Sequence, residues 1–400
     1  MINTEKWIWL SLAMTGGTPR MKRVLMHFGS AEAIYAADEE TIRAACLSIS
    51  GREVEALSDK NLAPAEKIVS ECIKKNIRIA PYGSKEYPER LWQIDNPPVV
   101  LYLKGEPLCA DAEAAVAIVG TRKASAAGKT AAEKIAGEIC ECGGVVVTGL
   151  AKGIDTYAAE GALRAGGKVI GVLGCGADIC YPRENKRLFA AVEQSGTIVS
   201  DYPPGTEPSR FNFPKRNRII SGISLGTVVV EAPKRSGALI TASLALEQNR
   251  DVFAVPGGIF EMAAEGSNEL IREGAIAVMS GYDVMSEYEA NYGIAASVRR
   301  KEREKSKKEQ AEKNAKNNAD AMCEGMREKV FSFPNGYLEK FSPQERAILE
   351  AIGENELRAD DISSQSGVGM QRLLSLLTLL EIRGSIKQLP GGRYKNIFVK

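Results

Sequence analysis

The feature that most restricts the fold of this chain is a regular alternation of two kinds of segment between about residues 113 and 280. Short runs that are apolar throughout and mostly β-branched are separated by stretches long enough to form helices. Continuously apolar runs are typical of strands covered on both faces. Their alternation with helices predicts an α/β fold, an extended Rossmann-like doubly wound parallel sheet. The predicted strands are residues 115–119, 145–148, 169–173, 197–200, 227–230, 252–255 and 275–278.

Three further regions surround this alternation. Residues 1–80 are expected to form a small helical N-terminal domain, which either packs as a cap or contacts DNA backbone. Residues 81–296, which contain the alternation, are expected to form the Rossmann-like domain, and the run 99–103 after two prolines predicts an edge strand. Residues 297–337 are expected to be a charged linker, because a segment so poor in apolar side chains cannot supply a core.

Residues 338–400 predict a winged-helix-like domain. Ser342 followed by Glu345 forms a capping box that begins a helix. Pro390-Gly391-Gly392 is a turn signal between two terminal strands. The amphipathic helix near residues 370–383 is unusually rich in leucine, which favours a protein contact or core packing over base recognition.

Composition excludes several classes of site. The single histidine, His27, lies far in the sequence from the glycine-rich centre, so neither a histidine-based triad nor a histidine-rich metal site is expected. The eight cysteines form no C-x-x-C unit and are expected to be free thiols in a reducing cytoplasm. The apolar stretch Trp7 to Met14 is shorter than the roughly 20 residues of a spanning helix, so no membrane segment is expected.

Glycine-rich turns follow the first three strands of the alternation. Gly120-Thr121-Arg122 combines close backbone approach with a guanidinium suited to phosphate, and Lys152-Gly153 precedes a helix N-terminus. The spacing is not that of a dinucleotide-binding fingerprint, and Gly128-Lys129-Thr130 lacks the glycine that a P-loop requires. Because ligands bind outside the carboxyl ends of parallel strands, the turns predict a polyanion lying across one edge.

The segment 211–218 concentrates cations and aromatic rings. Its composition suits single-stranded nucleic acid, because cations neutralise phosphate and aromatic rings stack on exposed bases. The alternative is a surface helix whose arginines form salt bridges. Further along, Ser236 and Gly237 open another helix, where a cap and free N–H groups favour phosphate. The candidate DNA contacts in these two segments are Phe213, Lys215, Arg216, Asn217, Arg218, Ser236 and Gly237.

Read together, these blocks resemble the DNA-processing protein A family (DprA, also called Smf). The resemblance covers about residues 80–280 and rests on seven ordered segments: VAIVGTRKAS, TGLAKGIDTYAAEGAL, GVLGCGADICYPREN, SDYPPGTEP, FPKRNRIISGIS, VVVEAPKRSGALITASLALEQNRDVFAVPG and GSNELIREGA. It implies a cytoplasmic, non-enzymatic homodimer that binds and protects incoming single-stranded DNA and helps to load RecA recombinase during natural transformation. It also implies a SAM-like or helix-hairpin-helix-like N-terminal domain and no cofactor or metal.

The same resemblance implies DNA contacts at Arg122 with its neighbour Thr121, at Phe213 and at the cations of 215–218. Ser236 and Gly237 would supply phosphate-binding backbone, and Lys152 with Gly153 is added from its position alone. Two other functions remain as alternatives. A nucleoside-monophosphate phosphoribohydrolase would use Glu231 near the glycine pair at 257–258, and an adaptor would act through the tail only.

Overall fold

The computed structural model describes residues 3–14, 19–45, 48–108, 110–293, 304, 333 and 336–397. The chain divides into two compact units, residues 1–306 and 307–400, and each is described by itself. Of the predicted linker at 297–337, all but positions 304, 333, 336 and 337 lie outside the described residues.

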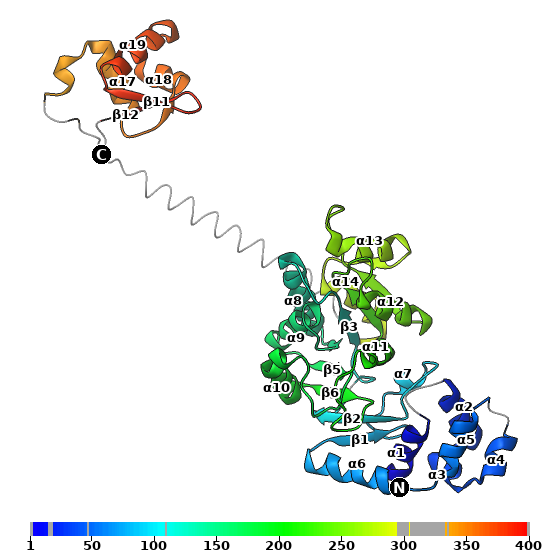
Figure 1. Cartoon of the computed structure of the whole chain (residues 1–400). Coiled ribbons are helices and arrows are strands. Elements are labelled where there is room, and N and C mark those ends of the chain that lie inside the picture. Colours follow the sequence, from blue (N-terminus) through cyan, green and yellow to red (C-terminus); the bar gives the residue numbers. More distant parts are fainter. Residues whose placement is uncertain are drawn as a thin grey trace. The chain divides into compact units, whose positions relative to one another are not determined.

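A mostly parallel sheet forms the centre of the first unit (Figure 1). Its spatial order over the described residues is β1-β2-β6-β5-β4-β3-β7-β8-β9, and neighbours from β6 to β9 pair in parallel. Each strand predicted from the alternation is present, which confirms the doubly wound sheet. The strands are β1 (Arg78–Pro81), β2 (Val100–Gly105), β3 (Ala115–Val119), β4 (Val145–Thr148), β5 (Val169–Leu173), β6 (Thr197–Ser200), β7 (Gly226–Val229), β8 (Asp251–Ala254) and β9 (Ile276–Ala277).

The prediction that residues 99–103 form an edge strand was wrong. This run forms β2, which lies between β1 and β6 and pairs antiparallel with both. Pro97 and Pro98 precede the strand, so every residue of β2 keeps the N–H that a two-sided ladder needs. The true edge is β1, a short strand that was not predicted from the sequence.

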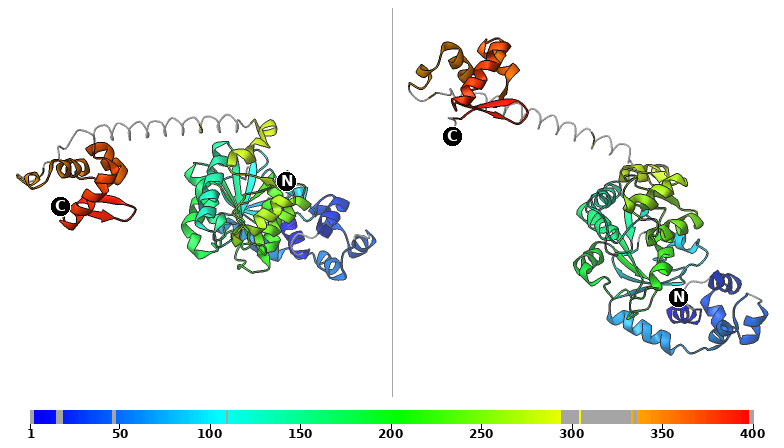
Figure 2. Two further views of the ribbon diagram at one scale, coloured as in Figure 1. Left: turned by 90° about the horizontal axis from the view of Figure 1, so that it is seen from above. Right: turned by 45° about the horizontal axis from the view of Figure 1, so that its top comes forward.

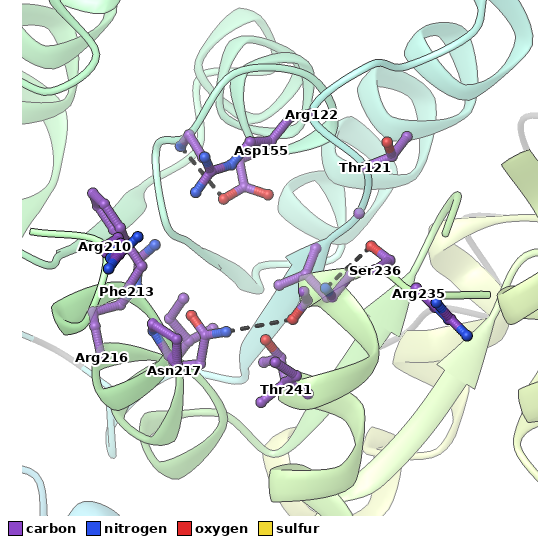
Figure 3. Close-up of a pocket in the computed structure, with 18 of the residues that line it drawn as sticks. Thr121, Arg122, Asp155, Arg210, Phe213, Arg216, Asn217, Arg235, Ser236 and Thr241 are labelled. Carbon is purple, nitrogen blue, oxygen red and sulfur yellow. Dashed lines mark hydrogen bonds between the residues drawn. The ribbon is translucent and has the colours of Figure 1, made fainter. Parts of the chain in front are cut away.

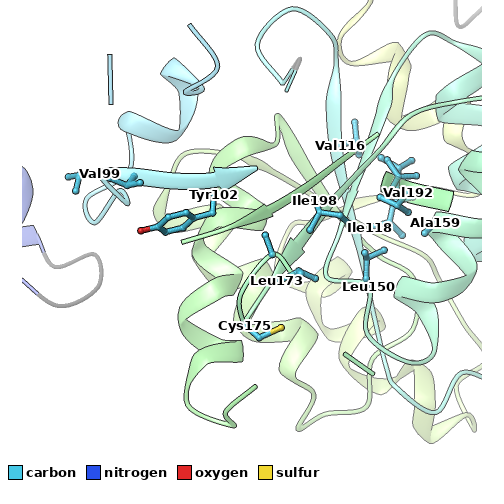
Figure 4. Close-up of a cluster of buried hydrophobic side chains, with 14 of the residues drawn as sticks. Val99, Tyr102, Val116, Ile118, Leu150, Ala159, Leu173, Cys175, Val192 and Ile198 are labelled. Carbon is cyan, nitrogen blue, oxygen red and sulfur yellow. The ribbon is translucent and has the colours of Figure 1, made fainter. Parts of the chain in front are cut away.

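Helices cover both faces of the sheet (Figure 1, Figure 2). The buried side chains of α8 (Ala126–Glu141), α9 (Ile154–Arg164), α10 (Lys186–Ser195) and α14 (Gly281–Ser286) pack in one apolar cluster, part of which Figure 4 shows. Those of α7 (Glu89–Trp92), α11 (Asn212–Ile223), α12 (Gly237–Glu247) and α13 (Glu265–Arg272) pack in a second. Successive residues of β3 serve the two clusters in turn, since Val116 and Ile118 join the first and Ala117 joins the second.

The N-terminal helices belong to the same compact unit as the sheet. Buried side chains such as Ile8 and Leu10 belong to the apolar cluster on the α8 face. Lys75 also forms an ion pair with Asp178, with 2.7 Å between Nζ and Oδ2. These helices therefore pack against the sheet domain. The N-terminal helices are α1 (Thr4–Ala13), α2 (Pro19–Phe28), α3 (Ala31–Ala36), α4 (Glu39–Ala44), α5 (Gly51–Ser58) and α6 (Ala63–Lys74). At the other end of the unit, α15 (Glu289–Tyr292) is the last helix before the gap that begins at residue 294.

The second unit has its own apolar core, which includes Ile348, Leu373 and Leu377. Its elements are α17 (Pro343–Ile352), β10 (Leu357–Arg358), α18 (Ala359–Ser366), α19 (Met370–Ile382), β11 (Ile386–Leu389) and β12 (Arg393–Asn396). The predicted capping box of Ser342 and Glu345 is present, and β11 and β12 pair as the predicted hairpin. A buried leucine face explains much of the apolar character of α19.

Candidate nucleic-acid interface

The sheet reverses its winding between β3 and β7. The chain proceeds from β3 through β4 and β5 to β6 on one side, then returns to β7 on the other side of β3. In an open α/β sheet such a switch point leaves a crevice outside the carboxyl ends of the strands. A pocket of about 540 Å³ lies there, lined by the loop after β3, the start of α9, helix α11 and the start of α12.

The loop after β3 is held in place by backbone hydrogen bonds. Thr121 N–H donates to the carbonyl of Glu231, at 2.7 Å, and the Thr121 carbonyl accepts from Ile154 N–H, at 3.1 Å. Gly153 has φ +83°, and a Cβ there would lie 2.2 Å from the Thr121 carbonyl oxygen. The glycine is therefore required for α9 to approach this loop, which presents the exposed Arg122 to the pocket.

Aromatic rings form one wall of the pocket. The Arg122 guanidinium lies 5.5 Å from the centre of the Phe213 ring. The Tyr181 ring stacks on Phe213, with 5.4 Å between the two centroids. The exposed Arg210 lines the same pocket beside Phe213, as Figure 3 shows.

The N-terminus of α12 forms the opposite side of the pocket (Figure 3). Ser236 caps the helix, because its hydroxyl accepts from Ala238 N–H at 3.3 Å. Gly237 and Arg235 are exposed next to this cap, and Asn217 of α11 donates a long hydrogen bond, 3.5 Å, to the Gly237 carbonyl. A helix N-terminus beside a cation favours an anion such as phosphate.

Arg216 lines the pocket but is 5% exposed. Its guanidinium donates to the carbonyls of Gly149 and Val172, at the ends of β4 and β5. Burial lowers the pKa of Arg216, and the nearby Asp155 carboxylate opposes that change. Burial likewise raises the pKa of Asp155, against the charge of Arg216 and the N–H groups of Ala151 and Gly149. Arg216 was expected to be exposed and to contact phosphate. Its burial instead makes it a support beneath the pocket.

Arg218, which was expected to contact DNA, is instead buried in an ion pair. Arg218 Nη2 lies 2.7 Å from Asp201 Oδ2, and the two side chains are 4% and 6% exposed. Such a pair is shielded from any ligand in solution. The physical reason is the phase of α11, which directs Arg218 toward the loop after β6 instead of the pocket.

Two other predicted contacts lie away from the pocket lining. Lys215 is exposed but borders a separate groove, of about 280 Å³, beside Tyr202 and Val99. Lys152 is exposed and pairs with Glu184 at 2.7 Å. The structure therefore gathers Thr121, Arg122, Phe213, Arg216, Asn217, Ser236 and Gly237 around one pocket, with Gly153 behind the loop.

Among the pocket residues that were not predicted as contacts are the aromatic Tyr181 and the two cations Arg210 and Arg235. Arg210 directly precedes the aromatic-cationic segment, and Arg235 directly precedes Ser236, so closeness in sequence could have suggested both. Tyr181 is supplied by the loop after β5, and only the fold brings it against Phe213.

Glu231, the carboxylate of the hydrolase alternative, is buried at the end of β7. Its Oε2 accepts a hydrogen bond from Ser125 N–H, at 2.9 Å, at the start of α8. A Cβ on Gly128 would lie 2.3 Å from that same oxygen, so Gly128 permits this contact. The carboxylate is thus engaged in capping a helix.

The described part of the chain shows neither a metal site nor a membrane-spanning helix. Across the ranges given above, no group of three or more His, Cys, Asp or Glu side chains is placed to hold a metal ion. No helix in those same ranges has the length and apolar character needed to cross a membrane.

These features define a class: a Rossmann-like protein with an arginine-lined, aromatic-walled pocket at the switch point of its sheet. The family model of DNA recombination-mediator protein A matches residues 78–289, and the DprA winged helix domain matches residues 338–392. The chain belongs to this DprA/Smf family, as the sequence blocks predicted.

The similarity extends to full-length relatives. The chain is 34% identical to protein Smf of Synechocystis over 413 residues, which covers 99% of this chain and 100% of that protein. It is 43% identical to DNA processing protein DprA of Bacillus subtilis over 214 residues, 54% of this chain and 72% of that protein. The X-ray structure of DprA from Streptococcus pneumoniae matches 72% of this chain and 99% of its own, with 36% identity and a TM-score of 0.63.

Proposed function

We propose that this protein binds single-stranded DNA in the pocket at the switch point, without catalysing a reaction on it. The observation that carries the proposal is the lining of the pocket: the exposed cations Arg122 and Arg210 lie beside the Phe213 ring, and the exposed Arg235 lies on the opposite side. Of the lining residues only Asp155 is acidic, and it is buried. Cations beside a half-buried aromatic ring match the alternation of phosphate and base along an unpaired strand.

An unpaired strand fits this arrangement better than a duplex. Stacking on Phe213 requires a base whose face is open, and the bases of a duplex already stack on their neighbours. The guanidinium groups bind phosphate, which every nucleotide carries, so we expect little dependence on sequence. The chain would therefore act on single-stranded DNA of any composition.

We further propose that the chain works in the cytoplasm as a homodimer, protects incoming single-stranded DNA and helps to load RecA recombinase in natural transformation. Membership of a DNA recombination-mediator family supports this role. The loop after β8 supports protein partners, because Ile259 and Phe260 are 84% and 94% exposed there and clustered exposed apolar side chains mark interaction surfaces.

The DNA-binding proposal can be tested by fluorescence anisotropy with labelled oligo-dT and with duplex DNA of equal length, over a series of salt concentrations. We expect oligo-dT to bind more tightly than duplex DNA. The slope of log affinity against log salt concentration should become shallower by about 0.7 for each phosphate that a variant no longer neutralises. The double variant Arg122→Ala/Arg210→Ala should lower the affinity and the slope. The matched control is Arg52→Ala/Lys67→Ala, because both side chains are exposed on the N-terminal helices. Equal affinity of wild type and the pocket variant would contradict the proposal.

A further inference from the structure

A second group of exposed cations begins two residues beyond the aromatic wall of the pocket. Arg183 lies in the short helix η1 (Arg183–Asn185), and Lys186 and Arg187 begin α10. Positions three and four apart lie on one side of a helix. The opposite side of α10 is buried through Leu188 and Val192. These three side chains, here called the α10 basic face, therefore point into solvent together.

The α10 basic face is not neutralised by neighbouring carboxylates. Within the described residues, none of its three cations forms an ion pair. The adjacent acid, Glu184, is engaged by Lys152, with 2.7 Å between Nζ and Oε1. Cations without a protein partner keep their full attraction for an external anion, whereas a paired cation must first release its carboxylate.

The α10 basic face is fixed to the wall of the pocket. Tyr181, two residues before Arg183, lines the pocket and stacks on Phe213. The side chain of Asn185 donates to the Leu150 carbonyl at 3.0 Å and to the Thr156 hydroxyl at 2.9 Å. These bonds tie η1 to helix α9 and to the loop between β4 and α9, whose Ala151 also lines the pocket. A strand that leaves the pocket past Tyr181 thus meets these cations next.

The size of the pocket makes such an exit necessary. Its volume of about 540 Å³ is within the range of about 300–1,000 Å³ that encloses one drug-sized ligand. It can therefore hold one or two nucleotides, whereas grooves for single strands cover about 4–16 nucleotides. The rest of a longer strand must lie on the surface outside.

We propose that the α10 basic face is a second DNA-binding site, which holds the phosphates of a single strand after it leaves the pocket past Tyr181. This inference rests on the proposed function of the pocket. Exposed lysine and arginine side chains without an aromatic ring would neutralise phosphates and would not read bases. The site extends the footprint and adds affinity only for strands long enough to reach it.

The test compares two lengths of oligo-dT, about 6 and about 16 nucleotides, which span the usual range of single-strand site sizes. The variant is Arg183→Ala/Lys186→Ala/Arg187→Ala. A milder second variant, Lys186→Gln/Arg187→Gln, preserves side-chain polarity should the triple change disturb α10. The matched control is Arg52→Ala/Lys67→Ala/Lys85→Ala, three exposed cations outside the pocket lining. Thermal unfolding by circular dichroism verifies that each variant is folded.

At 0.1 M salt, we expect the triple variant to bind the long oligonucleotide about 5-fold more weakly for each phosphate that it no longer neutralises. The slope of its log affinity against log salt concentration should be shallower than that of wild type by up to about 2. Its affinity for the short oligonucleotide should equal that of wild type. An equal loss of affinity for both lengths, no loss for the long one, or the same loss in the control would overturn the inference. Failure of wild type to bind either length would instead overturn the proposed function and this inference with it.

Discussion

The arginines around the pocket form two groups with opposite surroundings. Arg122, Arg210 and Arg235 are exposed and line the opening. Arg216 and Arg218 are 5% and 4% exposed and are directed at backbone carbonyls or at a carboxylate. One residue type thus supplies both the exposed lining of the pocket and the scaffold beneath it. A cation-rich motif therefore identifies a binding site only after the buried partners of each cation are known.

The two groups differ because burying a guanidinium is costly unless it is paired. Asp201 compensates the charge of Arg218, and Asp155 lies near Arg216. Burial raises the pKa of Asp201, and the charge of Arg218 opposes that rise. The exposed group needs no such compensation, so its charge remains available to phosphate. Three predictions test this division.

The largest expected effect is on stability, from Arg218→Ala. Removing one member of a buried ion pair leaves the other charge unpaired and costs about 3–5 kcal/mol. Urea unfolding followed by the fluorescence of Trp7, Trp9 and Trp92 measures it, since all three lie in the first unit. Arg122→Ala, in the exposed group, should change the free energy of unfolding by less than about 0.5 kcal/mol.

A double variant sharpens this first prediction. Replacing both partners, Arg218→Met with Asp201→Leu, leaves no unpaired charge and should recover much of the lost stability. If Arg218→Ala unfolded at the same urea concentration as wild type, the assignment of this arginine to the scaffold would be wrong.

The second prediction concerns the aromatic wall. Phe213→Ala should weaken oligo-dT binding by about 1–3 kcal/mol, the value of one base–aromatic stack. Phe213→Trp keeps a stacking surface and should bind nearly as well as wild type. Anisotropy titrations at one salt concentration measure both variants. A Phe213→Ala variant with unchanged affinity, or with a changed salt slope only, would show that Phe213 does not stack on a base.

The smallest effect on DNA binding is expected from Gly153→Ala, which disturbs the exposed group indirectly. An alanine at φ +83° and 2.2 Å from the Thr121 carbonyl must displace the loop that carries Arg122. The backbone conformation at Gly153, φ +83° and ψ −132°, is one that other residues rarely adopt, and it costs about 1–3 kcal/mol by itself. We expect a clear loss of stability and a smaller, indirect loss of DNA affinity. Gly51→Ala is the control, because a Cβ there meets no atom within 4 Å and Gly51 lies outside the pocket lining. Equal behaviour of the two variants would refute the proposed role of Gly153.

The sequence alone was sufficient for the sheet and for the family. The apolar run at 169–173 matches β5 at both ends because a strand buried on both faces must be apolar throughout. The run at 99–103 located β2, but its place inside the sheet depends on β1 and β6, which lie elsewhere in the chain. Local composition predicts that a strand forms, but it does not determine which strands will lie beside it in the sheet.

The site shows the same division. The sequence determined which loops reach the carboxyl edge of the sheet, because strand order along the chain and glycine spacing are local properties: Arg122, Phe213 and Ser236 were all predicted and all line the pocket. Only the tertiary structure decided which cations face solvent, because Asp155 and Asp201 reach α11 from distant positions. A side chain becomes part of the scaffold or of the binding surface through the partners that folding brings to it, and those partners are not adjacent in sequence.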